Sequence, residues 1–181
     1  MSDRLTEIAA FVEVARQRSF VRGAEHLQMS VSRVSRAVAA LELPPAVWKT
    51  CPWEPKALIE TGLRQWLHCA GAALRDDVVI GMPSHAVDEA WHGFILCTAR
   101  YAAFCEAAYG RFLHHHPEGS GSGAPDAMAD QLSRTVIAWS VVAAPGEACV
   151  LWDLDARVGV EAPWGVAPDH VAAVHAHQAA R

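Results

Sequence analysis

Apolar side chains recur at three- and four-residue spacings along most of this chain, and adjacent prolines at Pro44 and Pro45 divide the pattern in two. Such spacing places apolar side chains on one face of an α-helix. A proline ring lacks the amide donor and clashes with the preceding helical turn, so the pair ends any helix that reaches it. The sequence therefore predicts a mainly α fold, with a small unit at 1–43, a proline-rich linker at 44–56 and a helical domain at 57–181.

Length and charge are compatible with this division. The 181 residues are 52% apolar, which is enough for one core with a small appended module. The formal net charge is -5, but residues 1–42 hold six arginines against five acidic side chains. Any affinity for the phosphates of DNA is therefore expected in the N-terminal part, although its net charge of +1 gives only a weak electrostatic attraction.

Cysteine usage and hydropathy bear on the compartment. The five cysteines are odd in number and irregularly spaced, without a CxxC pair. The longest uncharged apolar runs, such as residues 135–145, are shorter than the roughly 18 residues that a membrane span needs. These features predict free thiols in a soluble, cytoplasmic protein with no membrane partner.

The first forty residues predict three short helices. The second is expected to begin near Phe20 with Ser19 as its N-cap, and the third to open at Ser30. Only Gln28-Met29-Ser30 separates these two helices, which is the tight connection of a helix-turn-helix. In the DNA-binding form of this motif, the second helix of the pair enters the major groove.

The outward side of the third predicted helix is suited to DNA. Serine hydroxyls permit close approach to the backbone, and arginines reach phosphates or the acceptor atoms of guanine. An ordinary solvated helix face has the same composition, so periodicity alone leaves both interpretations open. The candidate DNA-binding residues are Ser30, Ser32, Arg33, Ser35 and Arg36.

The order of residues in this part is more specific than its periodicity. Residues 4–42 read RLTEIAAFVEVARQRSFVRGAEHLQMSVSRVSRAVAALE, with Ser19-Phe20 before the second helix and Val34-Ser35-Arg36 in the third. This order resembles the first three helices of LysR-type transcriptional regulators, and the resemblance covers residues 3–42. It implies sequence-specific binding to double-stranded DNA, with a homodimer on paired half-sites as a hypothesis.

The chain departs from those regulators after Glu42. Where they continue into a two-stranded wing and a long dimerising helix, this chain runs into Leu43-Pro44-Pro45, and the remainder resembles no LysR effector domain. The resemblance therefore implies a truncated helix-turn-helix.

The most informative stretch after the prolines is a long predicted helix over residues 85–109, with Ser84 as its N-cap. Asp88 and His92 lie four residues apart on one face, and the chain continues into His114-His115-His116. An apolar stripe on the adjacent face comprises Val87, Trp91, Phe94, Tyr101, Cys105, Ala108 and Phe112. The stripe is expected to be buried.

A carboxylate and an imidazole at this spacing share one metal ion, or the carboxylate orients the imidazole. A histidine from 114–116 completes the site if the chain folds back. Asp88, His92 and His115 are therefore candidate ligands of a divalent metal ion. The alternative is an ordinary helix-face pair beside a solvated histidine loop.

The run AVDEAWHGFILCTARYAAFCEAAYGRFLHHHP starts at Ala86. It resembles a pattern that recurs in uncharacterised bacterial proteins and, more distantly, in the glycine-rich-domain proteins of plants and fungi. The shared positions are Asp88, Trp91-His92, Tyr101, Cys105, Gly110 and His115. The resemblance implies a shared fold and no particular reaction.

The rest of the chain predicts a GSGSG-like flexible segment at 118–125, two helices over 128–142 and 169–179, and a minor β element. Alternating apolar residues in 149–160 predict a short strand or hairpin, with Asp153 and Asp155 on its polar side. The histidines of the last helix, His170, His175 and His177, are expected to face solvent.

Short catalytic motifs are missing from the sequence. It has no phosphate-binding glycine loop, no HExxH, no GxSxG and no zinc-ribbon cysteine spacing. We therefore expect no enzymatic activity. Two functions remain open. The first is a DNA-binding transcriptional regulator, and the second is a helical metal-binding or interaction domain with a non-functional N-terminal unit.

Overall fold

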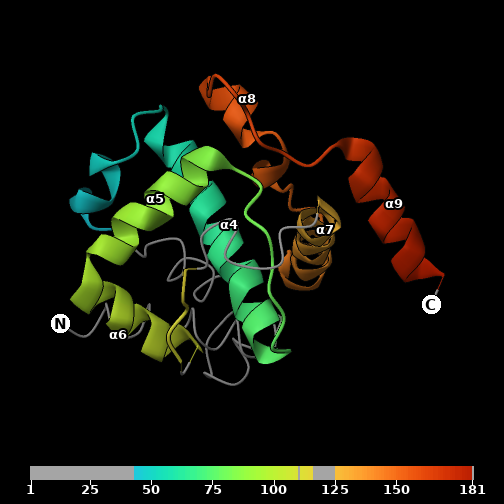
Figure 1. Cartoon of the computed structure of the whole chain (residues 1–181), viewed down its shortest axis with the longest axis horizontal. Coiled ribbons are helices and arrows are strands. Elements are labelled where there is room, and N and C mark those ends of the chain that lie inside the picture. Colours follow the sequence, from blue (N-terminus) through green and yellow to red (C-terminus); the bar gives the residue numbers. More distant parts are fainter. Residues whose placement is uncertain (1–42, 110, 116–124, 181) are drawn as a thin grey trace.

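The computed structural model describes residues 43–109, 111–115 and 125–180. Helices, short 3-10 helices and turns make up this part of the chain, and it contains no strand (Figure 1). The prediction of a mainly α fold is therefore confirmed. Residues 1–42 lie outside the described residues, and so do all the candidate DNA-binding residues, which are Ser30, Ser32, Arg33, Ser35 and Arg36.

Helix α4 (Lys56–Arg75) is central and packs against both α5 (His85–Leu96) and α7 (Pro125–Val142) (Figure 1). Its buried face follows the spacing that the sequence predicts. The side chains of this face that lie in the core are Ile59, Leu63, Trp66, Leu67 and Ala70. The rings of Trp66 and Trp91 lie 4.3 Å apart, so α4 and α5 meet through aromatic packing.

The segment before α4 is part of the core. It contains the 3-10 helix η1 (Pro45–Lys49), which packs against α5 and buries Val47 completely. A Cβ atom at Gly93 of α5 would lie 2.1 Å from the carbonyl oxygen of Val47, so only glycine permits this approach. Thr50 Oγ1 also donates to the carbonyl oxygen of Glu89 at 3.0 Å. The expected linker is thus docked on the helix that carries Asp88 and His92.

The prediction of a single helix over 85–109 is wrong. The chain forms two helices there, α5 and α6 (Thr98–Tyr109), which meet at Cys97. On one straight helix, residues seven apart are separated by about 10 Å along the axis. Across the bend, however, the ring centroids of Phe94 and Tyr101 lie 5.1 Å apart in an edge-on contact. The bend allows aromatic side chains of both helices to pack together, and local periodicity carries no signal for it.

The predicted minor β element is also wrong. Residues 149–160 form the 3-10 helix η2 (Val150–Trp152) and the short helix α8 (Leu154–Val158). The buried apolar side chains of these two helices are Leu151, Leu154 and Val158. They follow a spacing of three and four, which is helical, whereas the half-buried Val150 and Trp152 produce an apparent alternation.

The last helix, α9 (Pro168–Ala179), packs against α7. His175 and His177 are exposed, as predicted. His170 is half-buried instead, because its Nε2 lies 3.0 Å from Ser133 Oγ on α7. No helix of the described residues is long and apolar enough to cross a membrane.

Candidate metal centre

The first turn of α5, which contains the candidate ligand Asp88, is fixed by a buried carboxylate. Asp155 is fully buried, whereas the prediction placed it with the exposed Asp153 on a polar strand face. Its carboxylate accepts from the Ser84 hydroxyl at 2.6 Å and from the backbone N–H groups of His85, Ala86 and Trp164 at 2.8, 3.1 and 2.9 Å. The Ser84 hydroxyl oxygen in turn accepts from the backbone N–H of Val87 at 3.2 Å, so the predicted N-cap is confirmed.

Asp88 and His92 follow on a partly exposed face of α5. Their side chains are 16% and 36% exposed, and His92 Nδ1 lies 3.7 Å from Asp88 Oδ2. The carboxylate of Glu89 is beside them. Its Oε1 lies 3.9 Å from His92 Nδ1 and 3.8 Å from His85 Nε2. Sequence reasoning missed Glu89, although its spacing of three and four residues from those histidines could have indicated it.

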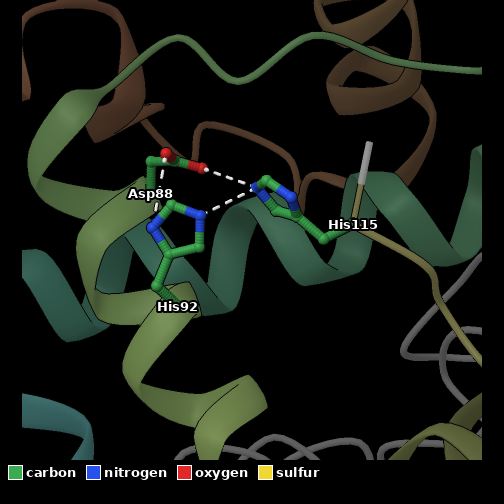
Figure 2. A group of neighbouring side chains, drawn as sticks. All are labelled: Asp88, His92 and His115. Atoms are coloured by element: carbon green, nitrogen blue, oxygen red, sulfur yellow. Dashed lines mark hydrogen bonds and ion pairs between the residues drawn. The ribbon is translucent and has the colours of Figure 1, made fainter. Parts of the chain in front are cut away.

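His115 reaches the same place from the segment that follows α6 (Figure 2). Its Nε2 lies 2.9 Å from His92 Nε2 and 3.7 Å from Asp88 Oδ1, and its side chain is 24% exposed. One ligand atom from each of the three residues lies within 4.8 Å of the other two. The structure therefore brings together the three residues that the sequence nominates as ligands.

Tyr101 holds the segment of His115 against α5. Its buried hydroxyl accepts from Trp91 Nε1 at 3.2 Å and donates to the carbonyl oxygen of Leu113 at 2.7 Å. Burial raises the pKa of Tyr101 above its usual value, so the hydroxyl stays protonated and able to donate. The Trp91 ring lies 4.9 Å from the His115 ring. The sequence placed Tyr101 in the apolar stripe, and only the structure shows its hydrogen bonds.

The neighbours of His115 in the sequence do not join the group. His114 is exposed, and its ring lies 4.9 Å from that of Phe112. Phe112 is itself 43% exposed, although the predicted stripe included it as a buried residue. His116 lies outside the described residues.

Two imidazole nitrogens at 2.9 Å face each other at hydrogen-bonding distance, so one ring donates and the other accepts in the absence of a metal ion. Donor atoms around a tetrahedral Zn²⁺ with bonds near 2.0 to 2.1 Å lie about 3.3 Å apart. The observed separations of 2.9 and 3.7 Å lie on either side of that value. Small side-chain movements would thus let the three residues replace the shared proton by a metal ion.

Comparison with known proteins gives two family matches on separate parts of the chain. The family model described as UCP032817-like matches residues 49–139, half of the chain, and this range contains all three candidate ligands. The model described as bacterial regulatory helix-turn-helix protein, lysR family, matches residues 5–43. Both resemblances inferred from the sequence are confirmed. Residues 3–42 were expected to resemble LysR-type regulators, and the remainder was expected to resemble an uncharacterised family. No curated protein and no solved structure matches the chain.

Proposed function

The chain belongs to the UCP032817-like family, and we propose that its helical domain binds one divalent metal ion through Asp88, His92 and His115. The observation that carries this proposal is the convergence of two imidazoles and one carboxylate on a single point. They come from a helix and from a segment that lies 23 residues farther along the chain. In the alternative, a helix-face pair beside a solvated histidine loop, nothing would require the two Nε2 atoms to meet, and they lie 2.9 Å apart.

The donor set also indicates which metal ions suit the site. Imidazole is a good ligand for Zn²⁺ and other first-row divalent ions, whereas Mg²⁺ and Ca²⁺ prefer sites made of oxygen atoms. Because an imidazole nitrogen binds a metal ion only when it is unprotonated, affinity should decrease as the solution becomes more acidic. We therefore propose Zn²⁺ or a similar ion as the occupant.

Calorimetric titration of the full-length protein with Zn²⁺ tests this proposal, and metal analysis after desalting gives the stoichiometry. We expect one Zn²⁺ per chain, and at least a 100-fold loss of affinity in His92→Ala and in His115→Ala. His175→Ala is the matched control, because His175 is exposed on α9 and has no place in the group. A wild-type protein that stays metal-free, or a His92→Ala variant that binds Zn²⁺ normally, would reject the site.

The match to the lysR family favours a second function, carried by a different part of the chain. We propose that residues 5–43 bind double-stranded DNA and that the protein is a transcriptional regulator with a truncated helix-turn-helix. The proposed contacts to bases and phosphates are Ser30, Ser32, Arg33, Ser35 and Arg36. A homodimer on paired half-sites is the arrangement that such motifs commonly use.

Fluorescence anisotropy with labelled duplex DNA, at low and at physiological salt, tests this second function. Affinity should decrease steeply with added salt, because binding releases counterions from the phosphates. The double variant Arg33→Ala/Arg36→Ala should lose most of the affinity. The control variant Arg111→Ala/Arg157→Ala changes two exposed arginines of the helical domain and should bind normally. Absence of binding even at low salt would contradict the proposal.

A further inference from the structure

We infer that the metal centre has an open coordination position, which holds an exchangeable water molecule and accepts a small anionic ligand. This inference rests on the metal-binding function proposed above. It goes beyond that function because it concerns what the bound ion can take from solution.

The number of protein donors is the first reason. Among the described residues, the group that could hold a metal ion consists of Asp88, His92 and His115. A Zn²⁺ ion bound by protein takes at least four ligands, and sites that serve only structure usually draw all four from the protein. The described residues thus supply three ligands and leave at least one position, which we infer to be taken by a molecule from solution.

Solvent access is the second reason. The side chains of Asp88, His92 and His115 are 16%, 36% and 24% exposed, so the point where they converge is within reach of water. The Trp91 ring, which is 4% exposed and lies 4.9 Å from the His115 ring, closes one side of the group. A ligand from solution would therefore enter from the open side of α5.

The remaining polar neighbours are placed to support the ligands rather than to complete the shell. Glu89 Oε1 approaches Nδ1 of His92, whereas the Nε2 atom of that ring faces His115. A carboxylate on the outer nitrogen fixes the ring orientation and makes the inner nitrogen a better donor. His114 is exposed, with its ring against Phe112. Neither side chain belongs to the group of described residues that could hold the ion.

Charge indicates the class of ligand. A divalent ion bound by one carboxylate and two neutral imidazoles carries a net charge of about +1 at the centre. A small monoanion with an oxygen or nitrogen donor would neutralise this charge, whereas a second cation would be repelled. Water occupies the position when no such anion is present.

Cobalt substitution tests the inference, because the visible absorption of Co²⁺ reports its coordination. The full-length protein is loaded with one Co²⁺ per chain and titrated with sodium azide and, separately, with sodium acetate. We expect a saturable change in the visible spectrum, with one anion bound per Co²⁺. Metal analysis after desalting confirms that the anion has not removed the ion.

A spectrum that stays constant up to tens of millimolar anion, with Co²⁺ bound, would overturn the inference and leave the metal-binding function intact. A failure to bind Co²⁺ at all would instead reject both. The variant His114→Ala should keep the wild-type spectrum and the response to azide. A changed spectrum in that variant, or a metal-dependent dimer in analytical ultracentrifugation, would show that protein closes the shell and would also overturn the inference.

The role of Glu89 is tested in the same experiment. Glu89→Gln should lower Co²⁺ affinity by roughly 10-fold, the smaller end of the range for partners that orient a ligand. Its spectrum at saturating Co²⁺ should still respond to azide as in the wild type. If that variant lost the response to azide, Glu89 would belong to the coordination shell, which would contradict the arrangement proposed here.

Discussion

Two tyrosine hydroxyls on α6 offer a comparison at the scale of single residues. Tyr101 donates to the carbonyl oxygen of Leu113, and Tyr109 donates to that of Leu67 at 2.9 Å. Burial raises the pKa of both tyrosines, so both hydroxyls remain protonated. Only Leu113 belongs to the segment that carries His115. The two hydrogen bonds are therefore alike in chemistry and differ in their relation to the metal centre.

Tyr101→Phe should lower Zn²⁺ affinity by about 10-fold, because the segment of His115 would lose its hydrogen bond to the core. Tyr109→Phe should leave the affinity unchanged. Tyr109→Phe should lose about 1 kcal/mol of stability, the usual value of one such bond, and Tyr101→Phe about 2 kcal/mol, because its hydroxyl also accepts from Trp91 Nε1. Calorimetry gives the affinities, and urea unfolding gives the stabilities. Equal Zn²⁺ affinity in both variants would show that Tyr101 does not position His115.

A second prediction concerns Asp155, whose buried carboxylate accepts four hydrogen bonds at and near the start of α5. In Asp155→Asn, an amide –NH₂ would face two of these donors, and we expect a loss of about 3 kcal/mol in the free energy of unfolding. Asp153→Asn is the control, since Asp153 is exposed and forms a surface ion pair with Arg157. That control should cost less than 1 kcal/mol.

Urea unfolding of both variants measures the difference. An Asp155→Asn protein as stable as Asp153→Asn would mean that the buried carboxylate is not what fixes the first turn of α5.

At the scale of elements, the close approach of η1 to α5 depends on Gly93. A Cβ atom there would lie 2.1 Å from a backbone oxygen, whereas a Cβ at Gly62 would meet the ends of the Leu154 and Val87 side chains at 2.6 and 2.8 Å. Side-chain ends can move, but a docked backbone cannot move without displacing the whole segment. The contact between η1 and α5 should therefore be more sensitive to substitution than that between α4 and its neighbours.

Gly93→Ala should thus destabilise the protein by about 3 kcal/mol or more, at or above the upper part of the range for overpacked sites. Gly62→Ala should cost roughly 1 to 2 kcal/mol, because flexible side chains can give way. Thermal and urea unfolding compare the two variants. An equal or smaller loss in Gly93→Ala would indicate that η1 can leave α5 at little cost in free energy.

At the scale of the whole molecule, stability should depend on pH through His68 on α4. Burial lowers the pKa of His68 to about 4 in the folded protein. The unfolded chain, with a histidine pKa near 6.5, binds the additional proton between these values, so stability is lost as pH falls from about 6.5 towards 4. We expect a loss of about 2 kcal/mol between pH 7 and pH 5 from this residue.

The comparison of wild type with His68→Leu isolates this contribution from the other histidines. Metal-free protein is unfolded in urea at pH 7 and at pH 5, and the change in free energy between the two is compared. The variant should lose about 2 kcal/mol less than the wild type over this interval. An identical change in both proteins would show that His68 does not control the pH dependence.

The part of the chain that is proposed to bind DNA and the proposed metal centre are connected through the segment that packs on α5. The lysR-family match ends at residue 43, and the described structure begins there with a segment that packs on α5. The helix that carries Asp88 and His92 therefore contacts the residues that directly follow the proposed DNA-binding part. The segment after the prolines, which the sequence predicts to be a linker, is docked in the core.

The sequence predicts some of the contacts in the candidate metal centre and not others. Asp88 and His92 share a face because they are one turn apart on a helix, and this relation needs only local geometry. His115 was one of three neighbouring histidines, and the pattern by itself did not establish that the chain folds back. Glu89 and Tyr101 had no role in the predicted site. The spacing of Glu89 from His85 and His92 could have indicated its contacts, whereas the hydrogen bonds of Tyr101 depend on side-chain directions that periodicity does not encode.

Local sequence patterns were sufficient to predict the helical fold class, the N-cap at Ser84 and the common helix face of Asp88 and His92. Each of these depends on residues within one or two helical turns. Local patterns could not predict the bend at Cys97, the burial of Asp155 in a helix instead of a strand, or the position of His115 beside His92. These depend on packing between segments far apart in the chain, where the free energy of long-range contacts overrides local preference.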